Sequence, residues 1–196
     1  TIQIQFSESV FITGTPTLTL ETGGTDRTVD IKGGSGSATL TGTYTVQSGD
    51  QSGDLAYTDT SALTLNGGTI QDSAGHTATL TLATPGPANS LSANKDLEVD
   101  GLAPAAPTIA TPIEGDGVVN ATEDDDVLVS GNGAENSATV TVKIDDGAST
   151  VTSTVTADGS GNWSLSGGDE LNVSSLLNGT LDLSVTQTDD AGNVSA

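Results

Sequence analysis

The stretch Val140-Thr141-Val142-Lys143-Ile144 alternates apolar and polar residues and leads directly into the turn sequence Asp145-Asp146-Gly147. A repeat of two is typical of a strand that buries one face, and Asp and Gly supply the backbone conformations of tight turns. The same alternation, mostly with threonine on the polar face, recurs in 2–6, 38–46, 78–82 and 181–185. Short alternating strands separated by turns predict an all-β chain of antiparallel β-sandwiches.

A proline-containing segment divides the chain near its middle. Residues 100–107 read Asp-Gly-Leu-Ala-Pro-Ala-Ala-Pro, and two prolines so close together do not fit a central strand. Each proline favours extended backbone in the residue before it, which predicts a short, stiff connector. We therefore expect one sandwich over residues 1–100, a linker over 101–106 and a second sandwich over 107–196. Because residues 2–6 already alternate like a strand, we expect the chain to be a fragment of a longer one.

The chain is strongly acidic and contains no cysteine. It has 26 Asp and Glu residues against 4 Lys and Arg, which gives a formal net charge of -22 over 196 residues. This charge argues against nucleic acids and anionic lipid surfaces as partners, because both attract clustered cations. Disulfides and thiolate-bound metals are excluded, so oxygen atoms remain as metal ligands. No apolar run reaches the roughly 18 residues that span a bilayer, and we expect no membrane insertion.

Motifs for catalysis are missing, and we expect no enzymatic activity. The chain has no cysteine nucleophile, no Gly-x-Ser-x-Gly elbow and no phosphate-cradling loop, and its single histidine, His76, has no identifiable serine partner. The single tryptophan, Trp163, is expected to anchor a core between two sheets rather than to stack on a sugar.

Two similar oxygen-rich turns are candidate calcium sites: residues 72–76, Asp-Ser-Ala-Gly-His, and residues 189–193, Asp-Asp-Ala-Gly-Asn. Loops of a sandwich alternate between its two ends, which predicts one group at the bottom of the first domain and another at the top of the second. Carboxylates about 4 Å apart repel by about 4 kcal/mol at an effective dielectric of 20, so such a junction needs a cation. Calcium accepts roughly six to eight oxygen ligands in a flexible shell. The predicted ligands at this junction are Glu8, Asp72, Asp100, Asp189, Asp190 and Asn193.

A second group of acidic and amide side chains lies in the loop after the first strand of the second domain. By the same topology, this loop and the turn after residues 138–144 face the domain that would follow. The predicted ligands there are Asp116, Asn120, Glu123 and Asp145, with Glu114 and Asp124 close in sequence. The spacing does not match an EF-hand loop. The alternative for all these acidic loops is a solvated surface that keeps the protein soluble and discourages pairing between sheet edges.

Four stretches of the second half carry a resemblance to a known family: 105–109, Ala-Ala-Pro-Thr-Ile; 115–123, Gly-Asp-Gly-Val-Val-Asn-Ala-Thr-Glu; 161–164, Gly-Asn-Trp-Ser; and 190–195, Asp-Ala-Gly-Asn-Val-Ser. The first half contributes 6–10, 14–18, 72–76 and 94–100. These stretches resemble the tandem immunoglobulin-like domains of giant bacterial surface adhesins of the repeats-in-toxin and biofilm-associated type. His76 stands where the pattern has Asn.

This resemblance implies a secreted, extracellular module at the bacterial cell surface that acts in adhesion and biofilm formation. It implies two immunoglobulin-like sandwiches in tandem that form part of an extended stalk, with Ca²⁺ bound at the junctions between domains. The implied partners are neighbouring immunoglobulin-like domains of the same chain, and the expected state in solution is a monomer.

The alternative function is a ligand-binding head that recognises a peptide or glycan through the first domain. Its candidate surface is the long segment 47–61, which contains Asp50, Asp54, Tyr57 and Asp59 and exceeds what a hairpin needs. An exposed tyrosine beside an open coordination site would favour a head, whereas a segment packed on its own sheet would favour a stalk.

Overall fold

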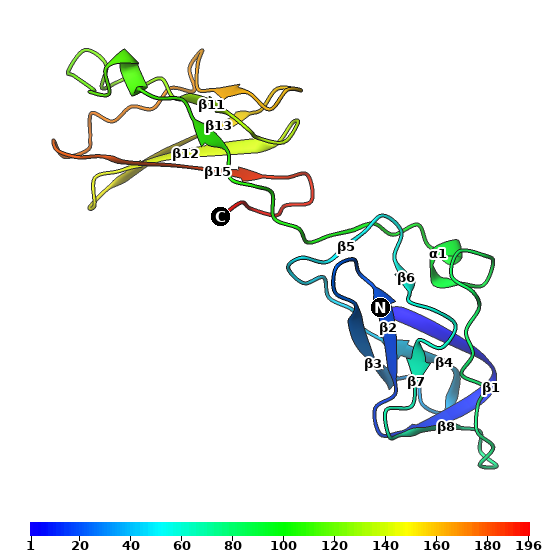
Figure 1. The fold of residues 1–196 in the computed structure, drawn as a ribbon. Coiled ribbons are helices and arrows are strands. Elements are labelled where there is room, and N and C mark those ends of the chain that lie inside the picture. The colour runs from blue at the N-terminus through cyan, green and yellow to red at the C-terminus, as the bar shows by residue number, and fades with distance from the viewer. The chain divides into compact units, whose positions relative to one another are not determined.

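The computed structural model describes all residues from 1 to 196. The chain forms two compact units, Thr1–Leu102 and Ala103–Ala196 (Figure 1). Helix is confined to two short pieces, α1 (Leu91–Asn94) and the 3-10 turn η1 (Ile113–Gly115). No helix has the length and apolar character needed to cross a membrane. Every strand pair is antiparallel, which confirms the predicted all-β, antiparallel class.

The first unit is built around one large sheet with the strand order β6-β2-β3-β4-β1-β8, to which β7 is added beside β2. A separate pair joins β5 to β9. The strands are β1 (Ile2–Thr13), β2 (Thr17–Glu21), β3 (Arg27–Gly33), β4 (Ser37–Gly42), β5 (Gln51–Ser52), β6 (Ala56–Tyr57), β7 (Leu63–Thr64), β8 (Thr69–Gln71) and β9 (Val99–Asp100).

Strand β1 changes partners along its length. Its first half pairs with β4, with Ile2 opposite Gly42, and its last residues pair with β8, with Phe11 opposite Gln71. The register shifts between Gln5 and Val10. This irregularity lets β1 pair with β4 along its first half and with β8 at its end.

Two predicted strands of the first unit are shorter or less regular than expected. Beyond β8, residues 77–82 form only an isolated bridge between Gln71 and Thr77. The alternating Ala78, Leu80 and Leu82 nevertheless pack against the core. Their alternation therefore reflects burial of one side of the segment, although the segment does not form a regular hydrogen-bonded strand. Likewise β4 ends at Gly42, so the prediction that this strand continues to Val46 is wrong.

The second unit consists of two three-stranded sheets. One has the order β10-β11-β14 and the other has the order β13-β12-β15. The strands are β10 (Thr108–Ile109), β11 (Ser130–Asn132), β12 (Thr139–Asp145), β13 (Thr150–Thr156), β14 (Trp163–Ser164) and β15 (Asp182–Thr188). The sequence Val140–Ile144 occupies the central strand β12, where Val140, Val142 and Ile144 are buried, as the alternation predicted.

Trp163 packs in the core of the second unit with only 3% of its surface exposed, which confirms its predicted role as a core anchor. It pairs with Gly131 of β11, and a Cβ at Gly131 would lie 2.5 Å from Cζ2 of the indole ring. Glycine at position 131 therefore makes room for the ring.

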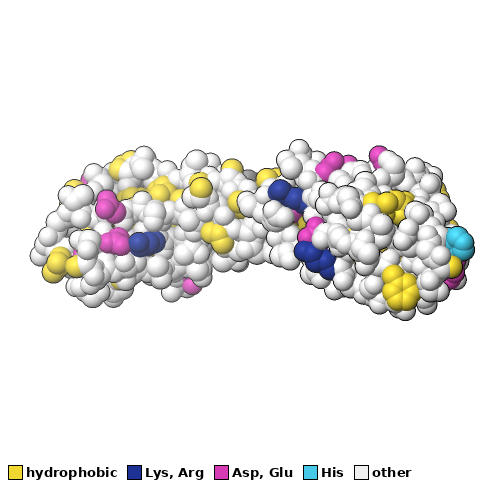
Figure 2. Space-filling model, turned by 90° about the horizontal axis from the view of Figure 1, so that it is seen from below, with side chains coloured by type: hydrophobic (Ala, Val, Ile, Leu, Met, Phe, Trp, Pro, Cys, Tyr) yellow, Lys and Arg dark blue, Asp and Glu magenta, His cyan; other side chains and the backbone are white.

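Acidic side chains outnumber basic ones by 26 to 4. The face drawn in Figure 2 is mostly white, the colour of backbone and uncharged polar side chains, with a few acidic and basic side chains among them. Two of the four basic residues form exposed pairs, Lys32 with Asp30 at 2.5 Å and Lys143 with Asp145 at 2.9 Å. Exposed pairs of this kind contribute at most about 1 kcal/mol each.

Candidate functional site

The predicted ligand Asp72 caps its own hairpin turn. Its Oδ1 accepts the backbone N–H groups of Ala74 at 2.8 Å and of His76 at 2.9 Å, and its Oδ2 lies 2.7 Å from Nδ1 of His76. The backbone closes the same turn, since Asp72 N–H donates to the carbonyl of His76 and Gly75 N–H donates to that of Asp72. Hydrogen bonding to the His76 side chain and backbone holds the pKa of Asp72 below its ordinary value.

The turn from Asp189 to Asn193 has the same geometry. Oδ1 of Asp189 accepts the N–H of Asn193 at 2.8 Å, and Oδ2 accepts from the Asn193 side-chain amide at 2.9 Å. A third copy, which the sequence suggested as a turn but not as a calcium site, runs from Asp158 to Asn162, with the corresponding bonds at 2.9 and 3.2 Å. The fourth residue of each turn is a glycine with a positive φ, in the order Gly75, Gly161 and Gly192.

These three turns show why the sequence pattern recurs. A hairpin whose fourth residue adopts a left-handed conformation needs glycine there, and an aspartate at its first position satisfies the free backbone N–H groups. In the third copy no calcium role was predicted, yet the bonds are the same. Hydrogen bonds from Asn193 lower the pKa of Asp189, as those from His76 do for Asp72. Asp190, next along the chain, is exposed.

The expected grouping of Glu8, Asp72 and Asp100 at one end of the first unit is wrong. Glu8 lies close enough to His76 for its charge to contribute to the raised pKa of that imidazole, after the larger effect of Asp72. Asp100 instead pairs with Gln51, and the adjacent Gly101 N–H donates to the Asp50 carbonyl. Asp50 also bonds to Tyr44, which follows closely after Gly42, the partner of Ile2 at the start of β1. Asp72 instead follows β8, which pairs with the other end of β1. The polarity assumed for β9 in the sequence argument was therefore reversed.

The acidic loop of the second unit is likewise held together by local hydrogen bonds. Asn120 and Glu123 bond reciprocally: Glu123 Oε2 accepts the N–H of Asn120 at 3.0 Å, and the N–H of Glu123 donates to the Asn120 carbonyl at 2.9 Å. Oδ1 of Asp116 accepts the N–H of Val118 at 2.8 Å. Such side-chain caps order a loop that has little regular structure.

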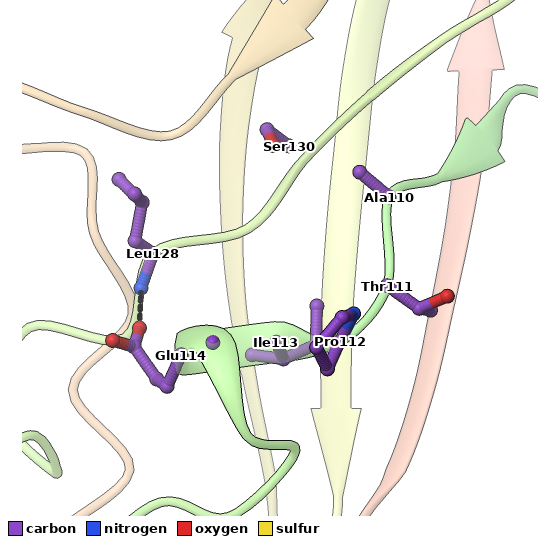
Figure 3. A pocket seen from close by; sticks show the side chains of 8 residues that line it. Ala110, Thr111, Pro112, Ile113, Glu114, Leu128 and Ser130 are labelled. Atoms are coloured by element: carbon purple, nitrogen blue, oxygen red, sulfur yellow. Dashed lines mark hydrogen bonds between the residues drawn. The ribbon is translucent and has the colours of Figure 1, made fainter.

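A shallow cavity of about 250 Å³ lies at the start of this loop (Figure 3). Its wall includes Pro112, Ile113 and Leu128, and its one charged side chain is Glu114. Figure 3 shows that the Glu114 carboxylate turns toward the backbone of Leu128, whose N–H donates to Oε1 at 2.5 Å. The carboxylate thus fixes the loop against the following segment.

The Asp145 side chain binds only groups of its own hairpin, β12 and β13 with the turn between them. Its carboxylate contacts Nζ of Lys143 at 2.9 Å and accepts the N–H of Gly147 at 2.7 Å and the hydroxyl of Thr150 at 2.9 Å. The Lys143 ammonium, followed by these hydrogen bonds, lowers the pKa of Asp145 to about 2. No three Asp, Glu or His side chains anywhere in the chain converge into a group that could hold a metal ion. A calcium site built on fewer carboxylates would need backbone carbonyl, amide or water oxygens to complete its shell.

The most buried charge in the chain is Asp50, whose surface is 0% exposed. Oδ1 forms an ion pair with Arg27 Nε at 2.6 Å, while Oδ2 accepts the Tyr44 hydroxyl at 2.6 Å and the N–H of Gln47 at 2.9 Å. Burial alone would raise the pKa of Asp50, but the hydrogen bonds from Tyr44, Gln47 and Arg27 outweigh it and lower the pKa. Burial, followed by hydrogen bonding to Asp50, raises the pKa of Tyr44 to about 12.

This network anchors the segment that leaves the first unit. The carbonyl of Asp50 accepts the N–H of Gly101 at 2.7 Å, and the carbonyl of Gly101 accepts the N–H of Gly49 at 2.8 Å. A Cβ at Gly101 would collide with the carbonyl of Gln47, so only glycine permits this close approach. The end of the first unit is thus bonded to a loop that is itself fixed by a buried ion pair.

Gln187 anchors the segment that begins the second unit. Its surface is only 1% exposed, its Nε2 donates to the carbonyl of Ala105 at 2.5 Å, and its Oε1 accepts the N–H of Glu135 at 2.7 Å. Its backbone is bonded in both directions to Ser195, whose N–H and hydroxyl take part. One buried amide therefore links the first and last segments of this unit.

The candidate head surface at 47–61 is anchored to its own unit by the buried residues Asp50, Leu55 and Tyr57, and other residues of the segment, including Asp54, are exposed. Tyr57 is 6% exposed, and its hydroxyl donates to the carbonyl of Ala83 at 2.5 Å. Asp50 is buried in the network described above, and Asp59 accepts the N–H and hydroxyl of Ser61, both at 2.6 Å. The tyrosine is therefore buried, without the exposure expected of a head surface.

Sequence reasoning did not identify Arg27, Tyr44 and Gln187 as key residues. Gln187 carried a usable signal, because it continues the apolar phase of Leu181, Leu183 and Val185 at a position where a polar residue needs buried partners. Arg27 and Asp50 lie 23 residues apart, and no local pattern joins them.

Two solved structures are similar to the chain. One is a tetra-tandem repeat in the extending region of a large adhesion protein, with 18% identity over 96% of this chain and 47% of that chain and a TM-score of 0.37. The other is a calcium-stabilised adhesin that helps an Antarctic bacterium to reach out and bind ice, with 23% identity over 97% of this chain and 47% of that chain and a TM-score of 0.38. The chain spans about half the length of each. No protein-family model and no curated protein match the sequence.

Proposed function

We propose that this chain is a calcium-stiffened extender module of a secreted bacterial adhesin, which carries load between a cell and a binding site elsewhere and so contributes to adhesion and biofilm formation. The observation that carries the proposal is a pair of anchors within residues 101–106, one near each end of this segment. Gly101 is bonded to the loop held by Asp50, and Ala105 is bonded to the buried amide of Gln187.

Anchors of this kind suit a module that transmits tension through its backbone. In the second unit, the first strand β10 and the last strand β15 belong to different sheets, so force applied at the ends acts on the packing between the sheets. The Gln187 amide resists the same force directly, because it joins the two segments. The sequence resemblance to adhesin stalk domains supports this proposal independently.

Stiffening by calcium is supported by the net charge of -22 and by the clustering of carboxylates in turns. The predicted ligands Glu8, Asp72, Asp100, Asp189, Asp190, Asn193, Asp116, Asn120, Glu123 and Asp145 remain proposals, with Asp100 no longer in one site with Asp72. Because the capping aspartates already accept backbone hydrogen bonds, any bound calcium would have to share or replace those donors.

Thermal unfolding of chelator-treated protein tests this part of the proposal. Millimolar calcium is expected to raise the melting temperature well beyond the effect of equal magnesium, which prefers a tighter octahedral shell and retains its waters. The matched magnesium sample controls for general screening of the negative charge. Equal shifts with both ions would show that the acidic loops are only a screened surface, and the extender would then have to be stable without calcium.

A further inference from the structure

Strand β13 has a sequence that reads the same in both directions. Residues 150–156 are Thr-Val-Thr-Ser-Thr-Val-Thr, with Ser153 at the centre, and six of the seven are β-branched. If two copies of this strand pair antiparallel about a two-fold axis at Ser153, each residue lies opposite a residue of the same type. The strand is therefore complementary to a second copy of itself.

The outer edge of β13 is open. The strand ends its sheet, and β12 is its only hydrogen-bonded neighbour there. In an antiparallel pair, the backbone groups of every second residue point toward the partner strand. Ala157 N–H donates to the Ala138 carbonyl, so the backbone groups of Val151, Ser153 and Val155 also point toward β12. The N–H and C=O groups of the intervening threonines point away from β12, and no backbone hydrogen bond joins them to another segment.

The strand has none of the features that usually protect an exposed edge. It contains no proline, no lysine and no other charged residue, and its pairing with β12 continues without a bulge from Thr150 to Thr156. Natural sheets normally protect their edges with such features, because an open edge pairs with other strands. The hydroxyl of Ser153 bonds to the carbonyl of Asp169, but this contact uses the side chain and leaves the backbone edge free.

We propose that β13 is a homotypic docking edge, where two copies of this chain pair antiparallel about Ser153 and join their sheets. Thr152 of one copy then lies opposite Thr154 of the other, and Thr150 lies opposite Thr156. The outward groups of these threonines supply roughly eight backbone hydrogen bonds. Threonine ladders form on the exposed face, and Val151 meets Val155 on the inner face.

Charge and area set the strength of this contact. In a chain with a net charge of -22, an uncharged edge is a place where a second copy can approach without facing carboxylates along the strand. Seven paired residues bury less than the roughly 1,200 Å² of a standard interface, so one contact is weak. Repeated contacts between long tethered chains would gain strength through effective concentration. The contact does not depend on calcium, so its test is separate from that of the proposed function.

Sedimentation of the full chain over a range of concentrations tests the proposal. The double variant Thr152→Glu/Thr154→Glu places like charges on facing positions, and we expect it to raise the concentration for half dimerisation at least tenfold. The control Gln3→Glu/Thr28→Glu adds the same charge at exposed strand positions of the first unit, and we expect a change of less than twofold. Wild-type protein that stays monomeric at millimolar concentration, or a control that weakens association equally, would overturn the proposal.

Cysteine crosslinking tests the register, because the chain has no cysteine of its own. Two copies of Ser153→Cys would have Cα atoms about 4.5 Å apart in a pair without direct hydrogen bonds, within the range of a disulfide. Two copies of Val155→Cys would lie roughly 14 Å apart along the strand and should not crosslink. Tryptophan fluorescence confirms that each variant is folded. Equal crosslinking at both positions would refute this register, and so would its absence at 153 under conditions where the wild type associates.

Discussion

Replacing Asp50 by alanine should destabilise the first unit and leave the second unit unchanged. The substitution removes the partner of the Arg27 guanidinium and the acceptor of the Tyr44 hydroxyl, in a site where the carboxylate is fully buried. Breaking a buried ion pair by removing one partner costs about 3 to 5 kcal/mol. Arg27 retains 24% side-chain exposure and can regain some water, so we expect the lower end, about 3 kcal/mol. For a unit of this size, that corresponds to a fall in melting temperature of roughly 12 °C or more.

The single tryptophan makes this assay specific to one unit. Trp163 fluorescence reports unfolding of the second unit, and circular dichroism reports both. Asp50→Ala should lower the melting temperature of one transition in circular dichroism and leave the melting temperature seen by fluorescence unchanged. Asp59→Ala is the matched control, because it removes an exposed aspartate from the same segment whose hydrogen bonds reach only Ser61.

Acidification should reproduce part of the effect in the wild-type protein. The pKa of Asp50 in the folded state lies below its ordinary value of 3.8. Its contribution to stability is therefore complete above that pH and is lost as the pH falls through the lowered value. Equal melting temperatures for Asp50→Ala and Asp59→Ala would refute the anchoring role of this network, and a shift in the fluorescence transition would refute its confinement to the first unit.

Two further substitutions test other parts of the structure. Gly131→Ala should destabilise the second unit by about 2 kcal/mol, because the added Cβ collides with the Thr108 carbonyl and the Trp163 ring; an unchanged fluorescence transition would contradict this packing. His76→Asn should remove a pH dependence of stability above pH 6.5. Asp72 raises the pKa of His76 in the folded state above 6.5, so the stabilisation is complete below pH 6.5 and is lost as the pH rises through the raised value. Melting temperatures of both proteins across this range check the second prediction, and parallel profiles would count against it.

The alternation of apolar residues predicted the sheets well where burial is one-sided and local. Val140, Val142 and Ile144 occupy the central strand β12 with their side chains in the core. The same period at Ala78, Leu80 and Leu82 marks residues that pack on the core without a ladder. Periodicity thus reports which side of a segment is buried, whereas hydrogen-bonded pairing also depends on whether a partner strand lies alongside.

The candidate site was harder to predict, because its residues were assigned through an assumed strand polarity. Placing Asp100 beside Asp72 required β9 to end at the far end of the unit, and its pairing with β5 reverses that. The acidic turns were correctly identified as recurring elements, but their shared sequence is explained by turn geometry, as the bonds of Asp158 show. Contacts between distant segments, such as Arg27 with Asp50, leave no local pattern from which to infer them.

The expected monomer and the proposed pairing through β13 are compatible, because each applies at a different protein concentration. A contact below the area of a standard interface leaves a dilute chain monomeric. Chains held at high local density, as on a cell surface, would associate through the same edge. The proposed adhesin module would then both extend away from the cell and bind neighbouring copies of itself.

The most direct test of the central claim is to pull the chain by its two ends in a single-molecule force experiment. An extender with two anchored units should unfold in two separate steps, each releasing on the order of 30 nm of chain. Gln187→Ala, which removes the buried bond to Ala105, should lower the force of one step and leave the other unchanged. Gradual extension without distinct steps, or two steps unaffected by Gln187→Ala, would contradict the proposal that these anchored units carry load.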